Sequence, residues 1–310
     1  MTGRALGTVF KRALAGWWSD NVPRLGASLS FYTLFALAPV LVVAIAIAGF
    51  FFGAEAVRGE VVEQLRGLLG EEGARAVQAM LEGAAVERES GLATGLGLFT
   101  FFIGATGAFL ELQTALNGIW RVKPREGGHW LKELVMQRLI SFGLVIGVGF
   151  LLLVSLLVSA ALAALNRYMG ITFPGLAELW QAAHLLFSFG VITLLFAMVY
   201  RVLPDVQLAW RDVWVGAMVT AGLFSIGKYV IGLYLGTSSL ASTYGAAGSV
   251  VVLLLWVYYS SQIVLLGAEF TREWVGMEGG KPRPMKHAKP DPEPEATGGG
   301  TAGQRGRGAG

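Results

Sequence analysis

LISFGLVIGVGFLLLVSLLVSAAL, residues Leu139–Leu162, is the stretch of sequence that decides the fold of this chain. It carries no charged side chain, whereas a helix of that length on the surface of a soluble protein shows a polar face. About 20 apolar residues in an α-helix, rising 1.5 Å each, cross the roughly 30 Å hydrocarbon core of a bilayer. The stretch therefore predicts a membrane-spanning helix.

Five further apolar runs of similar length predict five more spans. We expect the six spans at residues 28–53, 91–120, 139–163, 180–200, 213–235 and 249–271. Residues 121–138 and 201–212 then connect spans on one side of the membrane, and residues 54–90, 164–179 and 236–248 connect them on the other side. The sequence predicts an all-α fold, a polytopic membrane bundle of six transmembrane helices, with amphipathic helices added at the N-terminus and in the first outer loop.

The composition agrees with a membrane protein. The chain is 54% hydrophobic and 15% charged, and its mean hydropathy is +0.59, far from an average soluble domain. A formal charge of +3 is too small to indicate binding of nucleic acid. The chain has no cysteine, which excludes disulfides and any metal or redox site built on thiolates.

The distribution of Lys and Arg predicts the orientation. If both termini are cytoplasmic, 18 of the 24 cations lie in cytoplasmic segments. Cytoplasmic loops carry an excess of Lys and Arg in membrane proteins. We therefore expect a multi-pass protein of the bacterial cytoplasmic (inner) membrane, with the N- and C-termini in the cytoplasm.

Two segments outside the spans are predicted to form amphipathic helices. Residues 1–27 place Leu6, Phe10, Ala13 and Trp17 at helical spacing, which is typical of a helix lying in the cytoplasmic membrane interface. A solvated helix packed on the bundle fits the same pattern, and both interpretations stay open. Residues 54–90 repeat apolar residues at helical spacing on either side of a glycine-bounded break, which predicts two helices on the outer side.

The segment after the last span is predicted to be a disordered cytoplasmic tail, residues 272–310. From Gly276 onward, 15 of 35 residues are Gly or Pro, with no apolar periodicity. Such a composition cannot bury enough apolar surface to offset the loss of conformational entropy on folding.

Polar residues inside the predicted spans are the candidate functional residues, because hydrocarbon makes each of them costly to insert. We expect them to line a polar intramembrane cavity that binds a substrate: Lys228, Gln262, Tyr258, Glu111, His184, Ser188 and Glu269. Each has a structural alternative. Lys228 can extend to the outer interface, Glu111 and Glu269 can anchor the helix or pair with loop arginines, and His184 can be a satisfied bundle residue. Pro39 removes a backbone donor near the middle of the first span, so a kink is expected there.

Four blocks of sequence resemble one known family. They are RLGASLSFYTLFALAPVLVVAIAIAG (Arg24–Gly49), GATGAFLELQTALNGIW (Gly104–Trp120), YRVLPDVQLAWRDVWVGAMVTAGLFSIGKYVIGLYL (Tyr200–Leu235) and STYGAAGSVVVLLLWVYYSSQIVLLGAEFTRE (Ser242–Glu273). Their order and content resemble the YihY/BrkB family of bacterial inner-membrane proteins, over about residues 5–275. The resemblance implies six spans and no firmly assigned molecular activity. Members of this family were once labelled ribonuclease BN, and some carry a virulence label.

The resemblance marks individual positions as motif residues. Pro39 lies in the first-span block and Asn117 in an Asn-x-Ile-Trp ending. The fourth span ends in the Y-R-x-x-P-D element, formed by Tyr200, Arg201, Pro204 and Asp205. Tyr244 and Gly245 form an outer Tyr-Gly pair before the sixth span. The resemblance attaches no catalytic role to any of these residues.

Two functions from different classes fit the sequence. The favoured one is a transporter-like protein that handles a lipid or another amphiphilic envelope component through the polar cavity. The alternative is a structural or scaffolding protein of the cell envelope. A membrane-associated ribonuclease is a remote third, because no cluster of metal ligands is present to activate water on a phosphodiester. We expect no cofactor, no metal and no enzymatic activity. The expected partners are membrane lipids and an amphiphilic substrate or envelope proteins, and not nucleic acid.

Overall fold

The structure is a computed structural model, and it describes the chain in several separate ranges. These are residues 3–53, 107–124, 177–237, 244, 248–280, 282–285 and 287–291, with isolated positions between 58 and 81. The predicted span 139–163 and the predicted outer loop 164–179, apart from its last three residues, lie outside the described residues. So do residues 91–106 of the predicted span 91–120, residues 125–138 of the predicted cytoplasmic loop, and residues 292–310.

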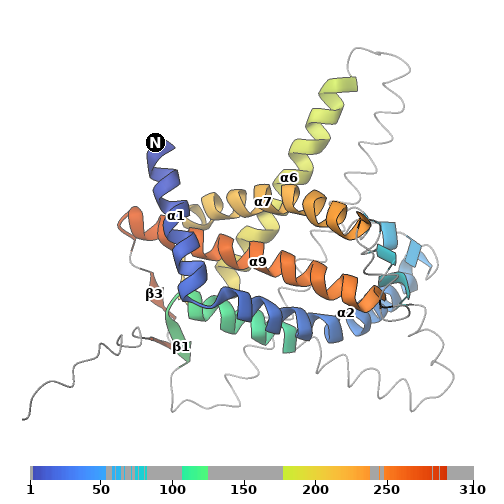
Figure 1. Cartoon of the computed structure of the whole chain (residues 1–310), viewed down its shortest axis with the longest axis horizontal. Helices are drawn as coiled ribbons and strands as arrows, with labels where there is room; N and C mark the ends of the chain where they lie inside the picture. Colours follow the sequence, from blue (N-terminus) through green and yellow to red (C-terminus); the bar gives the residue numbers. More distant parts are fainter. Residues whose placement is uncertain are drawn as a thin grey trace, which may run out of the picture.

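Helices make up most of the described chain (Figure 1). They are α1 (Gly3–Ser19), α2 (Val22–Phe52), a helix over residues 107–119, α6 (Ala177–Val202), α7 (Trp210–Thr237) and α9 (Gly248–Met277). Three stretches are long and apolar enough to cross a membrane, namely Leu185–Val202, Trp210–Thr237 and Val250–Met277. The chain is therefore a helical membrane protein, and the number of six spans stays a prediction.

The helix boundaries follow from local sequence. Asn21 adopts a left-handed backbone, with φ of 53°, between α1 and α2, and Pro23 stands in the first turn of α2. Proline is favoured there because its missing N–H would have no partner inside the helix. The backbone of α2 stays helical through Pro39, so the expected kink does not end the helix. α9 continues past the predicted span end at Thr271 to Met277.

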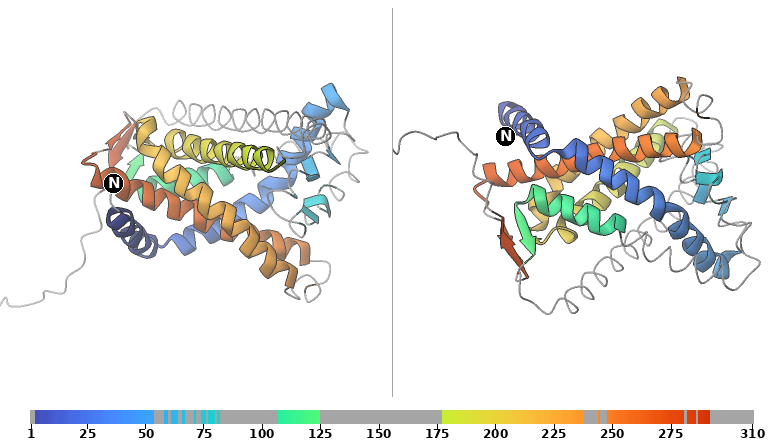
Figure 2. Two further views of the ribbon diagram at one scale, coloured as in Figure 1. Left: turned by 90° about the horizontal axis from the view of Figure 1, so that it is seen from above. Right: turned by 60° about the horizontal axis from the view of Figure 1, so that its bottom comes forward.

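α9 is the central helix of the described part. It packs against α1, α2 and α7, and α6 packs against α7. Figure 2 shows α1 at the end of α9 that carries Met277. Glycine allows the close approach of α7 and α9, because a Cβ added at Gly216 or Gly267 would collide with Thr271 or Thr220 across the interface. Close approach through small residues is how helices associate in lipid, where burial of apolar surface gives no drive.

Buried clusters show which segments share an end of the bundle. At one end Val77 and Leu81, from the predicted outer segment 54–90, pack with Ile45, Ile231 and Val252. At the other end Val9 and Ala13 of α1 pack with Phe270 and Trp274 of α9. The sequence predicts two such sets of segments, one on each side of the membrane, and that division stays a prediction. Which set faces the cytoplasm stays a prediction.

α1 packs on the bundle largely through the predicted apolar face. Of the predicted residues Ala13 is buried, Phe10 packs against the cluster with α9 and Trp17 packs against the main core, whereas Leu6 is exposed. The structure adds Val9 and Gly16 to this contact with α9. Leu14 and Trp18 remain 44% and 73% exposed on another side of the helix. α1 is thus docked on the bundle and also presents an apolar flank outward.

Two short antiparallel ladders correct the prediction of a wholly disordered tail. β1 (Val122–Pro124) pairs with β4 (Ala288–Pro290), and β2 (Val206–Gln207) pairs with β3 (Arg283–Pro284). We call residues 282–291 the strap. Its order comes from backbone hydrogen bonds to two loops and not from an apolar face of its own, although one of its residues, Ala288, is buried. The ladders are also the part of the described chain that departs from an all-α fold.

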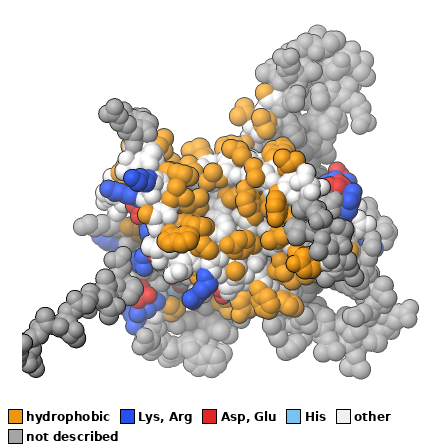
Figure 3. Space-filling model, viewed as in Figure 1, with side chains coloured by type: hydrophobic (Ala, Val, Ile, Leu, Met, Phe, Trp, Pro, Cys, Tyr) orange, Lys and Arg blue, Asp and Glu red, His pale blue; other side chains and the backbone are white. Residues whose placement is uncertain are grey.

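The surface has an apolar middle. On the face shown in Figure 3, hydrophobic side chains cover the centre of the bundle, and Lys and Arg side chains gather toward the end that carries α1 and the strands. At the opposite end Arg66 and Arg75 form ion pairs with Glu71. This arrangement is the one a bilayer-embedded bundle requires, because charges lie where water and headgroups can solvate them.

Candidate functional site

Gln262 is the candidate residue with the most unusual surroundings. It lies near the middle of the span in α9 and faces Gly26 of α2, where a Cβ would collide with its amide nitrogen. Both amide atoms, Oε1 and Nε2, are buried, and neither has a hydrogen-bond partner within the described part of the chain. Buried amides are paired in most proteins, so this group stands ready to bond a partner that enters from elsewhere.

The other predicted cavity residues lie on three further helices and elsewhere on α9. Lys228 of α7 is half-buried, with its ammonium 5.3 Å from the ring centroid of Tyr229. Tyr258 of α9, Glu111 of the 107–119 helix and Ser188 of α6 are also half-buried. His184 lies on α6, and its side chain is outside the described residues. No hydrogen bond or ion pair between described residues joins Gln262, Glu111 and Glu269 to one another, so the common cavity stays a prediction.

Glu269 belongs to an ionic cluster at the strand-bearing end. It is fully buried, and its Oε2 lies 2.8 Å from Arg272 Nη2. The contact is an ion pair without hydrogen-bond geometry, since both carboxylate oxygens lack a hydrogen-bond donor among the described groups. Gly16 of α1 lies directly against this carboxylate, where any larger residue would collide. Pairing with an arginine was the structural alternative for Glu269.

Arg272 is the centre of that ionic cluster. Its Nη1 donates to Asp20 Oδ2 at 3.0 Å and to the Ile119 carbonyl at 2.7 Å. Asp20 also accepts from Arg121 at 2.5 Å. The cluster therefore ties the α1–α2 turn, the end of the 107–119 helix and α9 together. Sequence reasoning missed Asp20; an acidic residue at the joint of two helices, on the side rich in arginine, is the signal that could have found it.

Asp205 is the centre of a second polar cluster at the same end. Its carboxylate accepts from Gln113 at 3.1 Å and from Asn117 at 2.8 Å, and its own backbone N–H donates to Asn117 Oδ1. His287 of the strap lies 3.0 Å from the same carboxylate, and the Met285 backbone N–H donates to the Asp205 carbonyl. The motif residues Asn117 and Asp205 thus join two helices to the strap.

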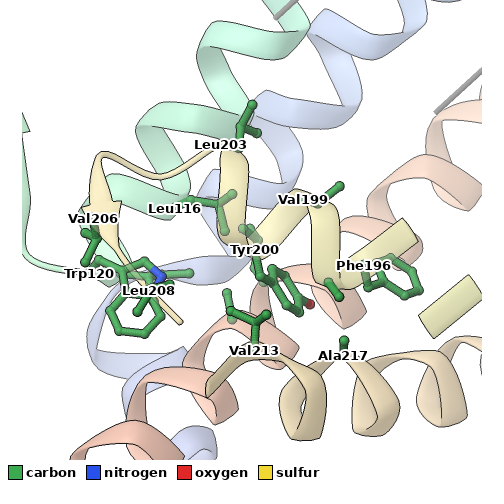
Figure 4. Packing of buried hydrophobic residues seen from close by; sticks show 14 of the residues in the cluster. Leu116, Trp120, Phe196, Val199, Tyr200, Leu203, Val206, Leu208, Val213 and Ala217 are labelled. Atoms are coloured by element: carbon green, nitrogen blue, oxygen red, sulfur yellow. The ribbon is translucent and has the colours of Figure 1, made fainter. Parts of the chain in front are cut away.

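The remaining motif residues build the turn from α6 to α7. Tyr200 lies at the centre of the cluster in Figure 4 and donates its hydroxyl proton to the Val264 carbonyl at 2.7 Å, with Thr220 Oγ1 at 2.9 Å. Arg201 donates to the Leu208 carbonyl and lies 4.7 Å from the Trp210 ring centroid. Pro204 is buried in the turn, Tyr244 is exposed, and Gly245 lies outside the described residues. These contacts are structural.

A hollow of about 410 Å³ opens beside the ionic cluster. It lies between α1, the end of the 107–119 helix, the end of α9 and the start of the strap. Seven of the described residues line it: Arg12, Trp120, Arg272, Glu273, Gly276, Met277 and Pro282. The sequence analysis singled out none of them as a site, because they come from segments that only the fold brings together. Across the described ranges, no group of three or more His, Cys, Asp or Glu is placed to hold a metal ion.

Comparison with known proteins gives one consistent family. The model of the family described as virulence factor BrkB matches residues 13–291. The chain is 31% identical over 266 residues to a UPF0761 membrane protein of Verminephrobacter eiseniae, covering 82% of this chain and 58% of that protein. It is 31% identical over 252 residues to one of Ralstonia nicotianae, covering 80% and 54%, and 30% identical over 272 residues to one of Pseudomonas paraeruginosa, covering 84% and 62%. The chain thus spans little more than half the length of these relatives. No solved structure matches it.

Proposed function

Because the chain belongs to the BrkB family of membrane proteins, we propose that it works within the bilayer as a transporter-like protein. Its substrate is a lipid or another amphiphilic component of the cell envelope. The proposal places it in the bacterial cytoplasmic membrane with both termini in the cytoplasm. The observation that carries the proposal is the buried amide of Gln262 near the middle of a span, which has no hydrogen-bond partner among the residues that the structure describes.

A buried amide without a hydrogen bond destabilises the folded protein, and an apolar side chain could fill the same space. Leaving such a group without a hydrogen bond costs about 1–3 kcal/mol. A leucine in its place would fill similar volume without that cost. Polar side chains within spans mark substrate or ion pathways by default. A headgroup or its accompanying water, entering between α2 and α9, would supply the missing donor and acceptor.

Half-buried polar groups on neighbouring helices support the same function. Lys228 on α7, Glu111 on the 107–119 helix and Tyr258 on α9 each offer a polar tip at a different depth. A zwitterionic or anionic headgroup crossing the bilayer needs such a series of partners, because its charged form is strongly disfavoured in hydrocarbon.

The test measures lipid translocation by the purified full chain and by two variants. Proteoliposomes of phosphatidylethanolamine and phosphatidylglycerol carry a trace of fluorescent phosphatidylglycerol, and dithionite bleaches only the outer leaflet. Gln262→Leu removes the unpaired amide. Ser261→Ala is the matched control, because Ser261 also contacts Gly26 but its hydroxyl is satisfied by the Val257 carbonyl.

We expect Gln262→Leu to slow translocation at least ten-fold and to raise the thermal midpoint, since it removes an unpaired buried group. Ser261→Ala should leave the rate within two-fold. A wild-type rate equal to that of protein-free vesicles contradicts the proposal for this probe class. A Gln262→Leu variant that is more stable and equally active contradicts the role of the amide.

A scaffolding function is the second candidate, and one observation favours it. α7 and α9 are in such close contact at Gly216 and Gly267 that neither position tolerates a Cβ. Together with the strap, this contact favours a rigid body. The same assay separates the two functions, because a scaffold would translocate no probe and yet would co-purify with envelope proteins under mild solubilisation.

We propose no enzymatic activity, and the ribonuclease label gives a direct test. The purified protein, freed of contaminating nucleases, should not cleave RNA with Mg²⁺, Mn²⁺ or Zn²⁺. Cleavage that follows the protein through purification and disappears in a point variant would contradict this proposal.

A further inference from the structure

Glu269 is a fully buried carboxyl group at the contact between α1 and α9. A Cβ added at Gly16 of α1 would lie 2.6 Å from its Oε2 atom, so α1 covers the carboxyl group closely. Neither carboxyl oxygen accepts a hydrogen bond from a residue that the structure describes. A buried carboxylate is stable in a protein when it is both paired with a cation and hydrogen-bonded. Glu269 has the cation, Arg272, without the hydrogen bonds.

The guanidinium of Arg272 is shared among three carboxyl groups. Its Nη2 atom lies 2.8 Å from Glu269 Oε2 and 3.4 Å from Glu273 Oε1, and its Nη1 atom lies 3.0 Å from Asp20 Oδ2. Arg272 donates hydrogen bonds to Asp20 and to Glu273, whereas its contact with Glu269 lacks hydrogen-bond geometry. Arg272 therefore keeps two hydrogen-bonded carboxylates as partners when Glu269 carries no charge.

Asp20 and Glu273 are better placed than Glu269 to hold a negative charge. Asp20 also pairs with Arg121. The side chain of Glu273 is 24% exposed and lines the hollow, where water can solvate it. Arg12 of α1 lines the same hollow and is exposed, so water screens its charge from the buried carboxyl group. Among the three carboxyl groups that share this guanidinium, a negative charge is least favourable on Glu269.

We propose that Glu269 is a proton-binding site, which holds a proton while α1 is docked on α9. The bound proton makes the carboxyl group neutral and gives it an O–H that can donate a hydrogen bond. The step is the uptake of one proton from water by a carboxylate, and it needs no other reactant. Arg272 lines the hollow and contacts Glu269, so the hollow brings water to the side of the guanidinium that is next to the site.

Proton binding at Glu269 is linked to the docking of α1. Gly16 of α1 lies directly against the carboxyl group, so movement of α1 away from α9 lets water reach it. Water stabilises the charged form of a carboxyl group. A ligand shifts a protein toward the conformation that binds it more tightly, and the bound proton therefore favours the docked position of α1. This inference does not depend on translocation and holds for a scaffold as well.

The test is infrared spectroscopy of the purified full chain in dodecyl maltoside, a detergent without a carbonyl group. A protonated carboxyl group has its own C=O band, which shifts in D2O because the proton exchanges. Glu269→Gln keeps the shape of the side chain and cannot ionise, and Glu269→Met is a second neutral variant of similar length. Glu273→Gln is the matched control, because Glu273 contacts the same Nη2 atom of Arg272 from a partly exposed position. The thermal midpoint of each variant is measured in parallel.

At neutral pH we expect a D2O-sensitive carboxyl band in the wild type that loses the intensity of one carboxyl group in both neutral variants of Glu269. Glu273→Gln should keep the full band. The neutral variants should also keep the thermal midpoint of the wild type, because they replace a neutral group with a neutral group. A carboxyl band that is unchanged in the Glu269 variants would overturn the inference. So would a midpoint that falls in both of them and not in Glu273→Gln, since Arg272 would then require the negative charge of Glu269.

Discussion

At the scale of single residues, Asp205 carries more connections than any other motif position described above. Its carboxylate accepts from Gln113, Asn117 and the His287 ring. Because Asp205 is 5% exposed, water cannot replace these partners. A buried, fully satisfied network is stabilising as a unit, and the same network is costly when one member is lost.

We therefore expect Asp205→Asn to destabilise the protein by about 2–4 kcal/mol. The amide nitrogen of the new side chain would replace one carboxylate oxygen, so one of the donors Gln113 and Asn117 would lose its acceptor. Thermal unfolding in detergent measures the loss. Asp291→Asn is the control, since the Asp291–Lys123 pair is half exposed and such a surface pair contributes about 0–1 kcal/mol. Equal midpoints for the two variants would contradict the role of Asp205.

Lys228 gives the second prediction at this scale. Lys228→Met keeps length and apolar volume but removes the charge, so the variant should insert and fold normally. If Lys228 contacts the substrate, the variant should fail to complement the envelope phenotype of a deletion strain, and Lys228→Arg should retain partial function because the charge survives. Full complementation by Lys228→Met at normal expression would identify the lysine as an interfacial anchor.

Single residues could be singled out from the sequence where the free energy of inserting a polar side chain into the membrane is high. Gln262 and Glu269 stand out because polar groups are expensive in hydrocarbon. The structure gives them different surroundings, an unpaired amide and an ion pair with Arg272. Asp20 could not be found from the sequence, because its role comes from Arg121 and Arg272 on segments that are distant in the chain.

At the scale of elements, helices were predictable and the strap was not. A long apolar run identifies α7 or α9 by itself, since the bilayer fixes the length required. The strap has the Gly- and Pro-rich composition of a disordered segment. Its two strands of two and three residues are stabilised by pairing with β1 and β2, and backbone pairing leaves no periodicity in the sequence.

We predict that ending the chain after Gly280 lowers the thermal midpoint, because it removes both ladders and the His287–Asp205 contact. Several backbone and side-chain hydrogen bonds of about 1 kcal/mol each are lost together. Ending the chain after Asp291 is the control and should leave the midpoint unchanged. A midpoint that falls as far in the control, or in neither variant, would show that the strap does not stabilise the bundle.

At the scale of the whole molecule, two ends with different chemistry define the topology. One end joins α1, Arg121, Asp205 and the strap, and the other joins residues 77–81 with the ends of α2 and α7. The grouping of segments by side follows from the six predicted spans, because each span reverses the side of the chain, and it stays a prediction. The residues that close the first end could not be predicted, since closure depends on tertiary contacts.

The prediction at this scale is the orientation. Reporter fusions at Gly73 and Gly245 should report the periplasm, and those at Gly127 and after Asp291 the cytoplasm, because 18 of 24 cations then lie inside. Fusing after Asp291 keeps the strap intact. A cytoplasmic signal at Gly73 would reverse the orientation, although it would not alter which segments share an end.

The strap is synthesised after the two loops with which it pairs. The strands β1 and β2 are synthesised well before residues 282–291. Both strands therefore have no pairing partner while the later helices are still being inserted. Proteins generally acquire structure from the N-terminal side during synthesis. One end of the bundle departs from this order, because β1 and β2 can pair only after the strap has been synthesised. A nascent chain stalled within α9 therefore presents two unpaired strand edges and an Asp205 without His287, features by which a protease or chaperone can distinguish it from the finished protein.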